Sequence, residues 1–270
     1  MNLRWIFSRA AAMSLALCMA ACGHGTNNSA DAASGAVDGA SQKVYVVGSD
    51  ASYAPFEYTN DHQAVVGFDV DVLTAIAAKS GFKVKFVNTP WEGIFSTLIQ
   101  GHRDILASSI TITPERMRSM DFSDSYFVGR QLMAVAKTQE DVRSFRDLKN
   151  KRVAVQVGTT ADSLVQKLQG VNSANLKRFE TMPQAMTALT LGEVDAAVGD
   201  NGEVSNFVHA HAQSGIYTIE DSASFAPERY GFAVKKGNQA LLDKINSGLA
   251  ALRVDGTYDA IYKKYFGESK

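Results

Sequence analysis

Cysteine is scarce in this sequence, whose 270 residues include only Cys18 and Cys22. Because both lie near the N-terminus, the rest of the chain holds neither a disulfide nor a cysteine nucleophile. Charge of either sign is also not in excess, since 27 basic and 28 acidic residues leave a net charge of −1. Without a basic surplus there is no electrostatic footprint for a polyanion, so we expect no binding to nucleic acid.

Several patterns that would indicate catalysis or a cofactor are missing as well. The sequence contains no recognisable set of Ser, His and Asp, or of Cys and His, for a nucleophilic enzyme. Gly158-Thr159-Thr160 lacks the Gly-Lys-Ser/Thr ending of a nucleotide-binding loop. His209 and His211 are two positions apart, and residues at that spacing do not share a face of a helix. We interpret these histidines as solvated surface and expect no metal ion and no cofactor.

Residues 1–42 are predicted to direct export and anchoring. A positively charged start precedes the apolar residues 10–21, which end in small side chains, and this order is typical of a signal peptide over residues 1–21. The apolar stretch is too short for a permanent membrane helix. Met19-Ala-Ala-Cys22 resembles the lipobox of bacterial lipoproteins, which implies a lipid on Cys22; the alternative is an ordinary signal that happens to be cleaved before a cysteine. Residues 22–42 have the composition of a flexible tether.

From residue 43 onward, strand patterns alternate with helix patterns. Strands are predicted over residues 44–47, 83–87, 105–107, 132–136, 152–157, 176–179, 194–198 and 230–234. Helices are predicted within residues 67–81, 93–101, 161–168, 183–192, 241–252 and 257–266, with Thr160 as the cap of the third. This alternation indicates parallel α/β sheets, and the length of the chain favours two domains.

The stretch that begins at residue 104 combines a buried strand with a polar tip. Residues 105–107 are apolar, and the alternation that follows places Ser109, Thr111 and Thr113 on one side of the chain. Thr113 is then a suitable N-cap for a helical turn, with a proline in the first helical position.

Arg116 follows in a place that breaks a local rule. It falls in the first turn of the predicted helix, where the helix macrodipole disfavours a cation. A broken local rule beside a strand end often marks a functional site. We therefore predict that Arg116 points back to the strand tip and receives an anion, with the hydroxyl groups of Ser109 and Thr111 beside it. The alternative is a surface arginine that pairs with Asp121 or Asp124.

One short pattern occurs twice in the chain. Residues 98–104 and 189–195 each run from a helix end through a glycine to an aspartate that precedes an apolar strand. Five residues beyond the two aspartates lie Ser109 and Asp200. Open α/β sheets bind ligands at the carboxyl ends of their strands, so the repetition places a polar group from each of two units at a shared site.

Six segments carry a resemblance to a known family, namely residues 49–58, 67–71, 109–116, 120–124, 199–202 and 256–266. Together they resemble the amino-acid-binding branch of the periplasmic solute-binding proteins of ABC importers, over nearly all of residues 43–267. The implied fold is the α/β, two-lobed periplasmic-binding-protein fold of type II. Each lobe is then a parallel-rich sheet flanked by helices, and two hinge strands connect the lobes.

The expected lobe boundaries follow from this fold. Lobe 1 comprises residues 43–132 and 231–270, and lobe 2 comprises residues 133–230. The chain is expected to cross between the lobes near residues 131–134 and again near residues 228–232.

The resemblance also implies which residues hold the backbone groups of a free amino acid. Arg116 matches the arginine that grips the α-carboxylate, which suits a bidentate guanidinium. The backbone N–H of Thr160, at a helix N-terminus, completes this anion site. Asp200 matches the carboxylate that binds the α-ammonium, and Ser109 and Thr111 supply further acceptors.

Other residues are implied to hold the ligand side chain. Tyr53 and Trp91 match the aromatic pair that encloses it. Asp50 and Ser108 stand where binders of basic amino acids place an acidic group and a hydroxyl. Gln156 stands at a position that varies with specificity, and a neutral amide is equally suited to a glutamine ligand. We expect arginine or lysine, with glutamine or another polar amino acid as the alternative.

The resemblance implies a lipid-anchored, monomeric protein of the periplasm or cell envelope that delivers its amino acid to the membrane permease of an ABC importer. The alternative from another class is a periplasmic dehydratase of the same fold that acts on cyclic pre-aromatic acids. Such an enzyme needs a general acid beside the leaving group. Besides Asp50, only Glu57 and Asp200 are obvious carboxyl groups near the expected cleft, so we expect a binding protein and not an enzyme.

Overall fold

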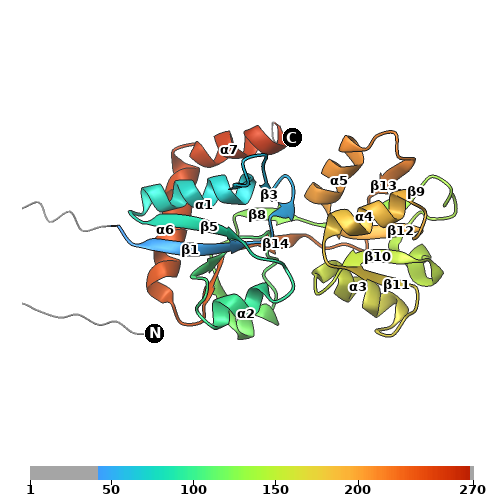
Figure 1. The fold of residues 1–270 in the computed structure, drawn as a ribbon, viewed down its shortest axis with the longest axis horizontal. Helices are drawn as coiled ribbons and strands as arrows, with labels where there is room; N and C mark the ends of the chain where they lie inside the picture. Colours follow the sequence, from blue (N-terminus) through green and yellow to red (C-terminus); the bar gives the residue numbers. More distant parts are fainter. Residues whose placement is uncertain (1–41, 268–270) are drawn as a thin grey trace, which may run out of the picture. The chain divides into compact units, whose positions relative to one another are not determined.

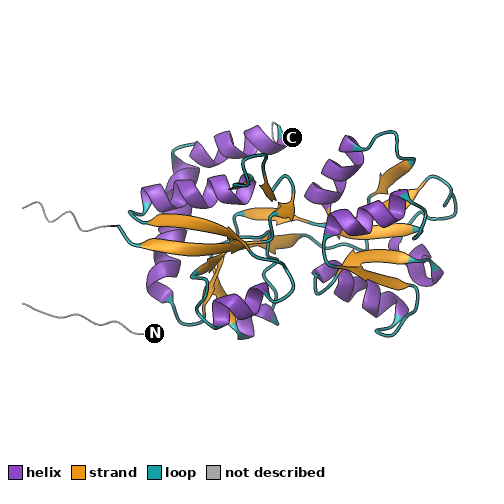
Figure 2. Ribbon diagram, in the orientation of Figure 1, coloured by secondary structure: helices purple, strands orange, loops and turns teal. Residues whose placement is uncertain are grey.

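The computed structural model describes residues 42–267 of the chain (Figure 1). The predicted signal peptide, Cys22 and all but the last residue of the predicted tether therefore lie outside the described residues. Within the described range, the strands form two separate five-stranded sheets, and helices lie against the faces of each sheet (Figure 2). None of the helices in this range is long and apolar enough to cross a membrane.

The first sheet has the strand order β5-β1-β6-β15-β7. Its strands are β1 (Val44–Ser49), β5 (Lys83–Asn88), β6 (Ile105–Leu106), β7 (Met120–Phe122) and β15 (Ala233–Lys235). Strands β5, β1 and β6 are parallel, whereas β15 pairs antiparallel with both β6 and β7. The helices of this lobe are α1 (Phe68–Lys79), α2 (Ile94–Ile99), α6 (Gln239–Val254) and α7 (Thr257–Phe266).

The strands of the first sheet contribute side chains to two cores. Ile105 and Val234 pack with residues of α1 and α6, whereas Leu106 and Ala233 pack with residues of α2. Figure 1 shows α1 and α7 on one side of β1 and β5, and α2 on the other. Successive side chains of a strand point to opposite faces, so each core takes every second residue. Burial on both faces fixes the position of β6, and with it the polar residues that follow.

The second sheet repeats this plan with the strand order β11-β10-β12-β9-β13. Its strands are β9 (Gln131–Ala136), β10 (Val153–Gln156), β11 (Leu176–Phe179), β12 (Ala196–Asp200) and β13 (Ile216–Ile219). Strands β11, β10 and β12 are parallel, and β9 pairs antiparallel with both β12 and β13. Helix α3 (Thr160–Gln169) and the 3-10 helix η2 (Phe145–Asn150) cover one face, and α4 (Met182–Thr190) and α5 (Asn201–Ala210) cover the other.

Two short strands, β8 (Phe127–Gly129) and β14 (Glu228–Tyr230), pair antiparallel and connect the two sheets. β8 leads from β7 into β9, and β14 leads from β13 towards β15. β14 falls within residues 228–232, and β8 precedes residues 131–134. Gln131 is the first residue of β9, so residue 132 lies inside that strand.

The predicted strand over residues 230–234 is divided between β14 and β15. Gly231 lies between the two pieces and approaches Ile112 so closely that a Cβ atom would stand 2.9 Å from Ile112 Cδ1. The chain turns there from the connecting pair into the first sheet. Tyr230, Ala233 and Val234 are all buried, so the apolar residues on both sides of Gly231 form one continuous strand pattern in the sequence.

The pattern that occurs twice in the sequence has the same structural role in both sheets. Asp104 Oδ2 accepts a hydrogen bond from Val46 N–H at 2.8 Å, and Asp195 Oδ2 accepts one from Arg152 N–H at 2.8 Å. The N–H groups of the same aspartates donate to the carbonyls of Val46 and Arg152. Asp104 therefore joins the start of β6 to β1, and Asp195 joins the start of β12 to the residue that precedes β10. This register brings the ends of β6 and β12, and the polar residues beyond them, to fixed places.

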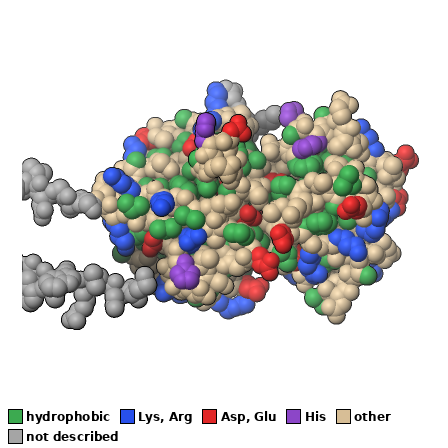
Figure 3. Space-filling model, in the orientation of Figure 1, with side chains coloured by type: hydrophobic (Ala, Val, Ile, Leu, Met, Phe, Trp, Pro, Cys, Tyr) green, Lys and Arg blue, Asp and Glu red, His purple; other side chains and the backbone are tan. Residues whose placement is uncertain are grey.

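The surface carries charges of both signs. On the face that Figure 3 shows, basic and acidic side chains of the described residues are interspersed, in keeping with the small net charge. The two neighbouring histidines are both exposed at the end of α5. The ring of His211 stacks on Phe207 at 4.0 Å, and its Nδ1 contacts the Phe207 carbonyl at 2.9 Å.

Replacing Asp104 with alanine should destabilise the protein, because the Val46 N–H loses its carboxylate partner in the middle of a sheet. We expect the free energy of unfolding in urea to fall by about 1–3 kcal/mol. Asp61→Ala removes an exposed carboxylate and should change it by less than about 0.5 kcal/mol. Equal unfolding midpoints for the two variants would show that the Asp104 carboxylate does not hold the strands together.

Candidate ligand-binding site

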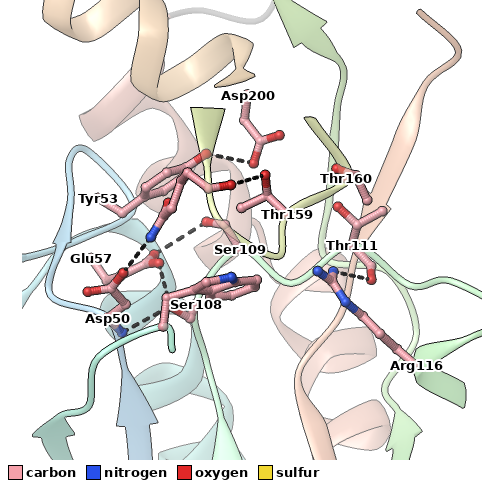
Figure 4. Close-up of a pocket in the computed structure, with 12 residues that line it drawn as sticks. Asp50, Tyr53, Glu57, Ser108, Ser109, Thr111, Arg116, Thr159, Thr160 and Asp200 are labelled. Atoms are coloured by element: carbon pink, nitrogen blue, oxygen red, sulfur yellow. Dashed lines mark hydrogen bonds between the residues drawn. The ribbon is translucent and has the colours of Figure 1, made fainter. Parts of the chain in front are cut away.

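Residues from both sheets line a pocket of about 350 Å³, a volume that includes its opening (Figure 4). The lining residues are Asp50, Tyr53, Glu57, Trp91, Ser108, Ser109, Thr111, Arg116, Gln156, Thr159, Thr160 and Asp200. All ten residues predicted to hold the ligand are among them. The structure therefore brings the predicted set together in one place, and it adds Glu57 and Thr159.

Strand ends position most of these groups. Asp50 directly follows β1, and Ser108 and Ser109 follow β6; Gln156 and Asp200 are the last residues of β10 and β12. These are the carboxyl ends of the parallel strands in both sheets, where open α/β sheets bind ligands. A small three-stranded sheet, β2 (Ser52–Tyr53), β3 (Glu57–Thr59) and β4 (Val65–Val66), adds two further lining residues.

Arg116 points to the strand tip, as predicted. Its Nη1 donates to the Thr111 carbonyl at 2.9 Å and its Nη2 to the Gly158 carbonyl at 3.5 Å. The guanidinium also lies over the ring of Trp91, 5.3 Å from its centroid. The alternative partner Asp121 instead pairs with Lys236 at 2.6 Å. Arg116 therefore contacts carbonyl oxygens and aromatic rings.

The helical turn around Arg116 is shorter than predicted. Thr113 Oγ1 accepts the Arg116 N–H at 3.2 Å, as an N-cap does. However, the turn is only the 3-10 helix η1 (Arg116–Arg118), which leads directly into β7. Arg116 is its first residue, so the side chain leaves the backbone beside the strand tip.

Asp200 lies on the opposite side of the pocket from Arg116 (Figure 4). Its Oδ2 accepts the Tyr53 hydroxyl at 2.8 Å, and its Oδ1 accepts Gln131 Nε2 at 2.6 Å. Burial raises the pKa of Asp200 to about 6, and the negative charge of Glu228 adds to the effect. The bond to Tyr53 joins the small sheet of the first lobe to the second lobe.

The start of α3 differs from the prediction by one residue. Thr159, and not Thr160, is the N-cap: its hydroxyl oxygen accepts the Asp162 N–H at 3.2 Å. Thr160 is thus the first helical residue, and no carbonyl within the helix can accept its N–H. Its hydroxyl is also free of the capping role and donates to Glu228 Oε2 at 2.9 Å. Two adjacent threonines follow Gly158, and the sequence does not distinguish which of them caps the helix.

A second polar region of the pocket consists of hydrogen-bond acceptors. Asp50 Oδ2 accepts Gln156 Nε2 at 3.0 Å, a bond between the two lobes. Gln156 Nε2 also donates to the Glu180 carbonyl at 3.0 Å, so both amide hydrogens are used. Burial raises the pKa of Asp50, and the bonds from Gln156 and Ser52 oppose this. The groups of Asp50 and Gln156 that are left for a ligand are oxygen atoms.

Glu57 and Asp69 form a buried carboxyl pair beside this region, with 1% and 0% of their surface exposed. The two carboxyl groups lie close enough for each to act on the pKa of the other. Burial and then the charge of Asp69 raise the pKa of Glu57 well above its usual range, and burial raises the pKa of Asp69 to about 6. Two interacting acids are thus buried together beside the pocket.

Ser109 connects the carboxyl pair to the pocket. Its φ of 47° is in the left-handed region, which costs a non-glycine residue roughly 1–2 kcal/mol. The conformation is held because the Ser109 N–H donates to Asp69 Oδ2 at 2.8 Å and its hydroxyl to Glu57 Oε2 at 3.3 Å. Ser108 donates to the other Glu57 oxygen at 2.9 Å. Strain of this kind is typical of functional sites.

Glu57 is the most informative residue that sequence reasoning missed. The sequence offers Glu57 only as a candidate general acid of an enzyme, although this residue lies four positions after Tyr53 in a segment that carries the family resemblance. What the sequence does not reveal is that Glu57 faces the serines that follow β6, because that contact joins residues about 50 positions apart.

Comparison with known proteins places this site in a family. The family described as "Bacterial extracellular solute-binding proteins, family 3" matches residues 45–268. The match covers most of the chain, and the chain therefore belongs to this family.

Three similar proteins illustrate the range of relatives. A "Probable histidine-binding protein" of Neisseria gonorrhoeae is 39% identical over 272 residues, which cover 99% of this chain and 97% of that protein. The "L-cystine-binding protein TcyA" of Bacillus subtilis is 31% identical over 258 residues, which cover 93% and 92%. The structure of the arginine-, lysine-, histidine-binding protein ArtJ from Geobacillus stearothermophilus is 38% identical, with a TM-score of 0.81, and the match covers 84% of this chain and 97% of that one.

These findings decide between the two classes considered from the sequence. The family is one of solute-binding proteins, and all three relatives are named for binding. The chain is a binding protein and not a dehydratase. The two-lobed α/β fold of type II that the resemblance implied is confirmed.

The raised pKa of Asp200 makes the stability of the empty protein depend on pH in one direction. The folded-state pKa of about 6 exceeds the ordinary value of 3.8, so the folded protein keeps a proton that the unfolded chain releases. The resulting stabilisation is fully present below about pH 4 and is lost as the pH rises through about 6.

Asp200→Asn carries a neutral side chain at every pH and isolates this contribution. Relative to that variant, the unfolding free energy of the wild type should fall by up to about 3 kcal/mol between about pH 4 and pH 7. Urea denaturation at several pH values measures both proteins. Parallel pH profiles would contradict the assignment.

Proposed function

We propose that this protein binds one free amino acid in the pocket between its lobes and delivers it to the membrane permease of an ABC importer. The observation that carries the proposal is a pair of opposite charges that do not meet. Arg116 donates to backbone carbonyls, and Asp200 accepts from neutral Tyr53 and Gln131. A zwitterion offers both of these charged groups their missing partner.

The two backbone charges of an amino acid fit these groups. Its carboxylate is held by the Arg116 guanidinium and by the N–H of Thr160 at the start of α3, where the helix macrodipole favours an anion. Its ammonium is held by Asp200 together with the hydroxyl oxygens of Ser109 and Thr111. Charged hydrogen bonds contribute roughly 1.5–3 kcal/mol each, so either group is required for tight binding.

We propose that the ligand side chain is cationic, with arginine or lysine preferred. Asp50 and Gln156 offer only acceptor oxygens to the ligand, and the carboxyl group of Glu57 lines the same pocket. A guanidinium or ammonium group consists only of donors and matches this arrangement, whereas the carbonyl of glutamine does not. Trp91 and Tyr53 suit the aliphatic stem. The relatives named for histidine and for arginine, lysine and histidine fit a cationic ligand.

Closure of the lobes is the proposed means of capture. The ligand contacts residues of both lobes, so it favours the state in which they are close. The β8–β14 pair provides the hinge about which the lobes rotate. All proposed contacts come from a single chain, so we propose that the monomer is the functional unit.

Calorimetry with a panel of arginine, lysine, histidine, glutamine and cystine tests the function and its specificity. We expect heat from arginine or lysine with the wild type. A response to glutamine or cystine alone would overturn the cationic preference, and no response to any amino acid would overturn the function itself.

Asp50→Asn should weaken arginine or lysine binding by roughly tenfold or more, because a charged acceptor is lost. Binding of glutamine, if measurable, should be unchanged or improved. Asp61→Asn removes the same charge from an exposed turn and serves as the matched control. An equal loss for cationic and neutral ligands would show that Asp50 acts on the fold and not on specificity.

We propose further that the protein works in the periplasm, held to a membrane by a lipid on Cys22. The wild type expressed in bacteria should partition into the detergent phase in a phase-separation experiment, and Cys22→Ala into the aqueous phase. Cys18→Ala is the matched control and should behave as the wild type, because Cys18 is predicted to leave with the signal peptide. Detergent partitioning of Cys22→Ala would refute the anchor.

A further inference from the structure

One carboxylate that does not line the pocket bonds to two hydroxyl groups that do. Glu228, the first residue of β14, accepts hydrogen bonds through Oε2 from Thr111 Oγ1 at 2.8 Å and from Thr160 Oγ1 at 2.9 Å. The amide of Gln131 donates to the same oxygen at 3.2 Å. Glu228 is therefore surrounded by groups of the proposed binding site.

These bonds decide what the two threonines can do in the pocket. A hydroxyl group has one hydrogen to donate and two lone pairs that accept. A carboxylate only accepts, so the hydrogens of Thr111 and Thr160 are both directed to Glu228. What each hydroxyl retains for a ligand is a lone pair. The two groups can accept a hydrogen bond from a ligand ammonium, but they cannot donate one to a ligand carboxylate.

We propose that Glu228 is a positioning residue for recognition of the α-ammonium group. It holds the Thr111 and Thr160 hydroxyls as acceptors and so makes this part of the pocket select a donor cation. The inference rests on the proposed amino-acid binding and adds to it a residue outside the predicted set.

Gln131 joins this arrangement to Asp200. Its Nε2 donates to Asp200 Oδ1 at 2.6 Å and also lies within hydrogen-bonding distance of Glu228 Oε2 and Thr160 Oγ1. The Gln131 amide thus lies between the carboxylates of Asp200 and Glu228 and contacts both. The result is a set of oxygen acceptors that extends from Asp200 to Thr111, whose backbone carbonyl accepts the Arg116 guanidinium.

The position of Glu228 links ammonium recognition to the arrangement of the lobes. Thr111 follows β6 of the first sheet, Thr160 begins α3 of the second, and Glu228 lies in the strand that connects the lobes. Both hydroxyls reach the same oxygen atom only while the two lobes are close. The complete ammonium site therefore forms in the closed arrangement and not in either lobe alone.

The test compares ligands with and without the α-amino group on Glu228→Gln. The probes are L-arginine and 5-guanidinopentanoate, L-lysine and 6-aminohexanoate, and L-glutamine and 4-carbamoylbutanoate, measured by calorimetry. We expect Glu228→Gln to bind the amino acid roughly tenfold more weakly or worse, and to bind its desamino partner about as well as the wild type does. An equal loss for both members of a pair, or no loss for either, would overturn the proposal.

A double-mutant cycle tests the route through the hydroxyl and remains informative where a desamino ligand binds too weakly to measure. Thr111→Val removes the hydroxyl with little change in shape. In that background the loss caused by Glu228→Gln should shrink, because the group that Glu228 orients is gone. Losses that simply add would contradict the proposed route.

Glu115→Gln is the matched control for charge. Glu115 is exposed, and its negative charge also acts on Arg116, but no bond from its side chain to the two threonines is found among the described residues. This variant should bind the amino acid as the wild type does. A wild type that binds no amino acid of the calorimetry panel would reject the proposed function, and with it the role of Glu228. Normal wild-type binding with an unselective Glu228→Gln would reject only the role of Glu228.

Discussion

The pocket depends on charges that the protein holds apart. Bringing a guanidinium and a carboxylate together would neutralise both, yet Arg116 is directed to backbone carbonyls and aromatic rings while Asp200 is occupied by a phenol and an amide. Removing charges from water is costly unless partners compensate, and neutral partners compensate a charge less than an opposite charge does. A ligand with complementary charges supplies the stronger partner to both groups, and this gain favours binding.

Much of this site was predictable because strand ends are visible in a sequence. Ser109 and Asp200 lie just beyond strands predicted from apolar runs, and the rule for open α/β sheets assigns both to one site. The family resemblance added the others, among them Asp50 and Gln156 at strand ends, Tyr53 in the short strand β2 and Trp91 in a loop. Each of these residues depends on its local sequence for its position.

What was missed depends on contacts between distant parts of the chain. The role of Glu57 depends on hydrogen bonds from serines about 50 positions away, and the role of Glu228 depends on those from Thr111 and Thr160. The raised pKa of Glu57 needs two buried acids side by side, which no spacing in the sequence reveals. The division of residues 230–234 into two strands likewise follows from a close approach to another segment. Long-range packing overrides local pattern in all of these cases.

The place of Trp91 has an optical consequence. The sequence contains two tryptophans, and the other one, Trp5, belongs to the predicted signal peptide. If that peptide is removed, the one remaining indole lines the pocket and lies under the Arg116 guanidinium. Its emission then reports on one location, without background from elsewhere in the chain. The unlabelled protein carries its own fluorescent indicator of whether the pocket is occupied.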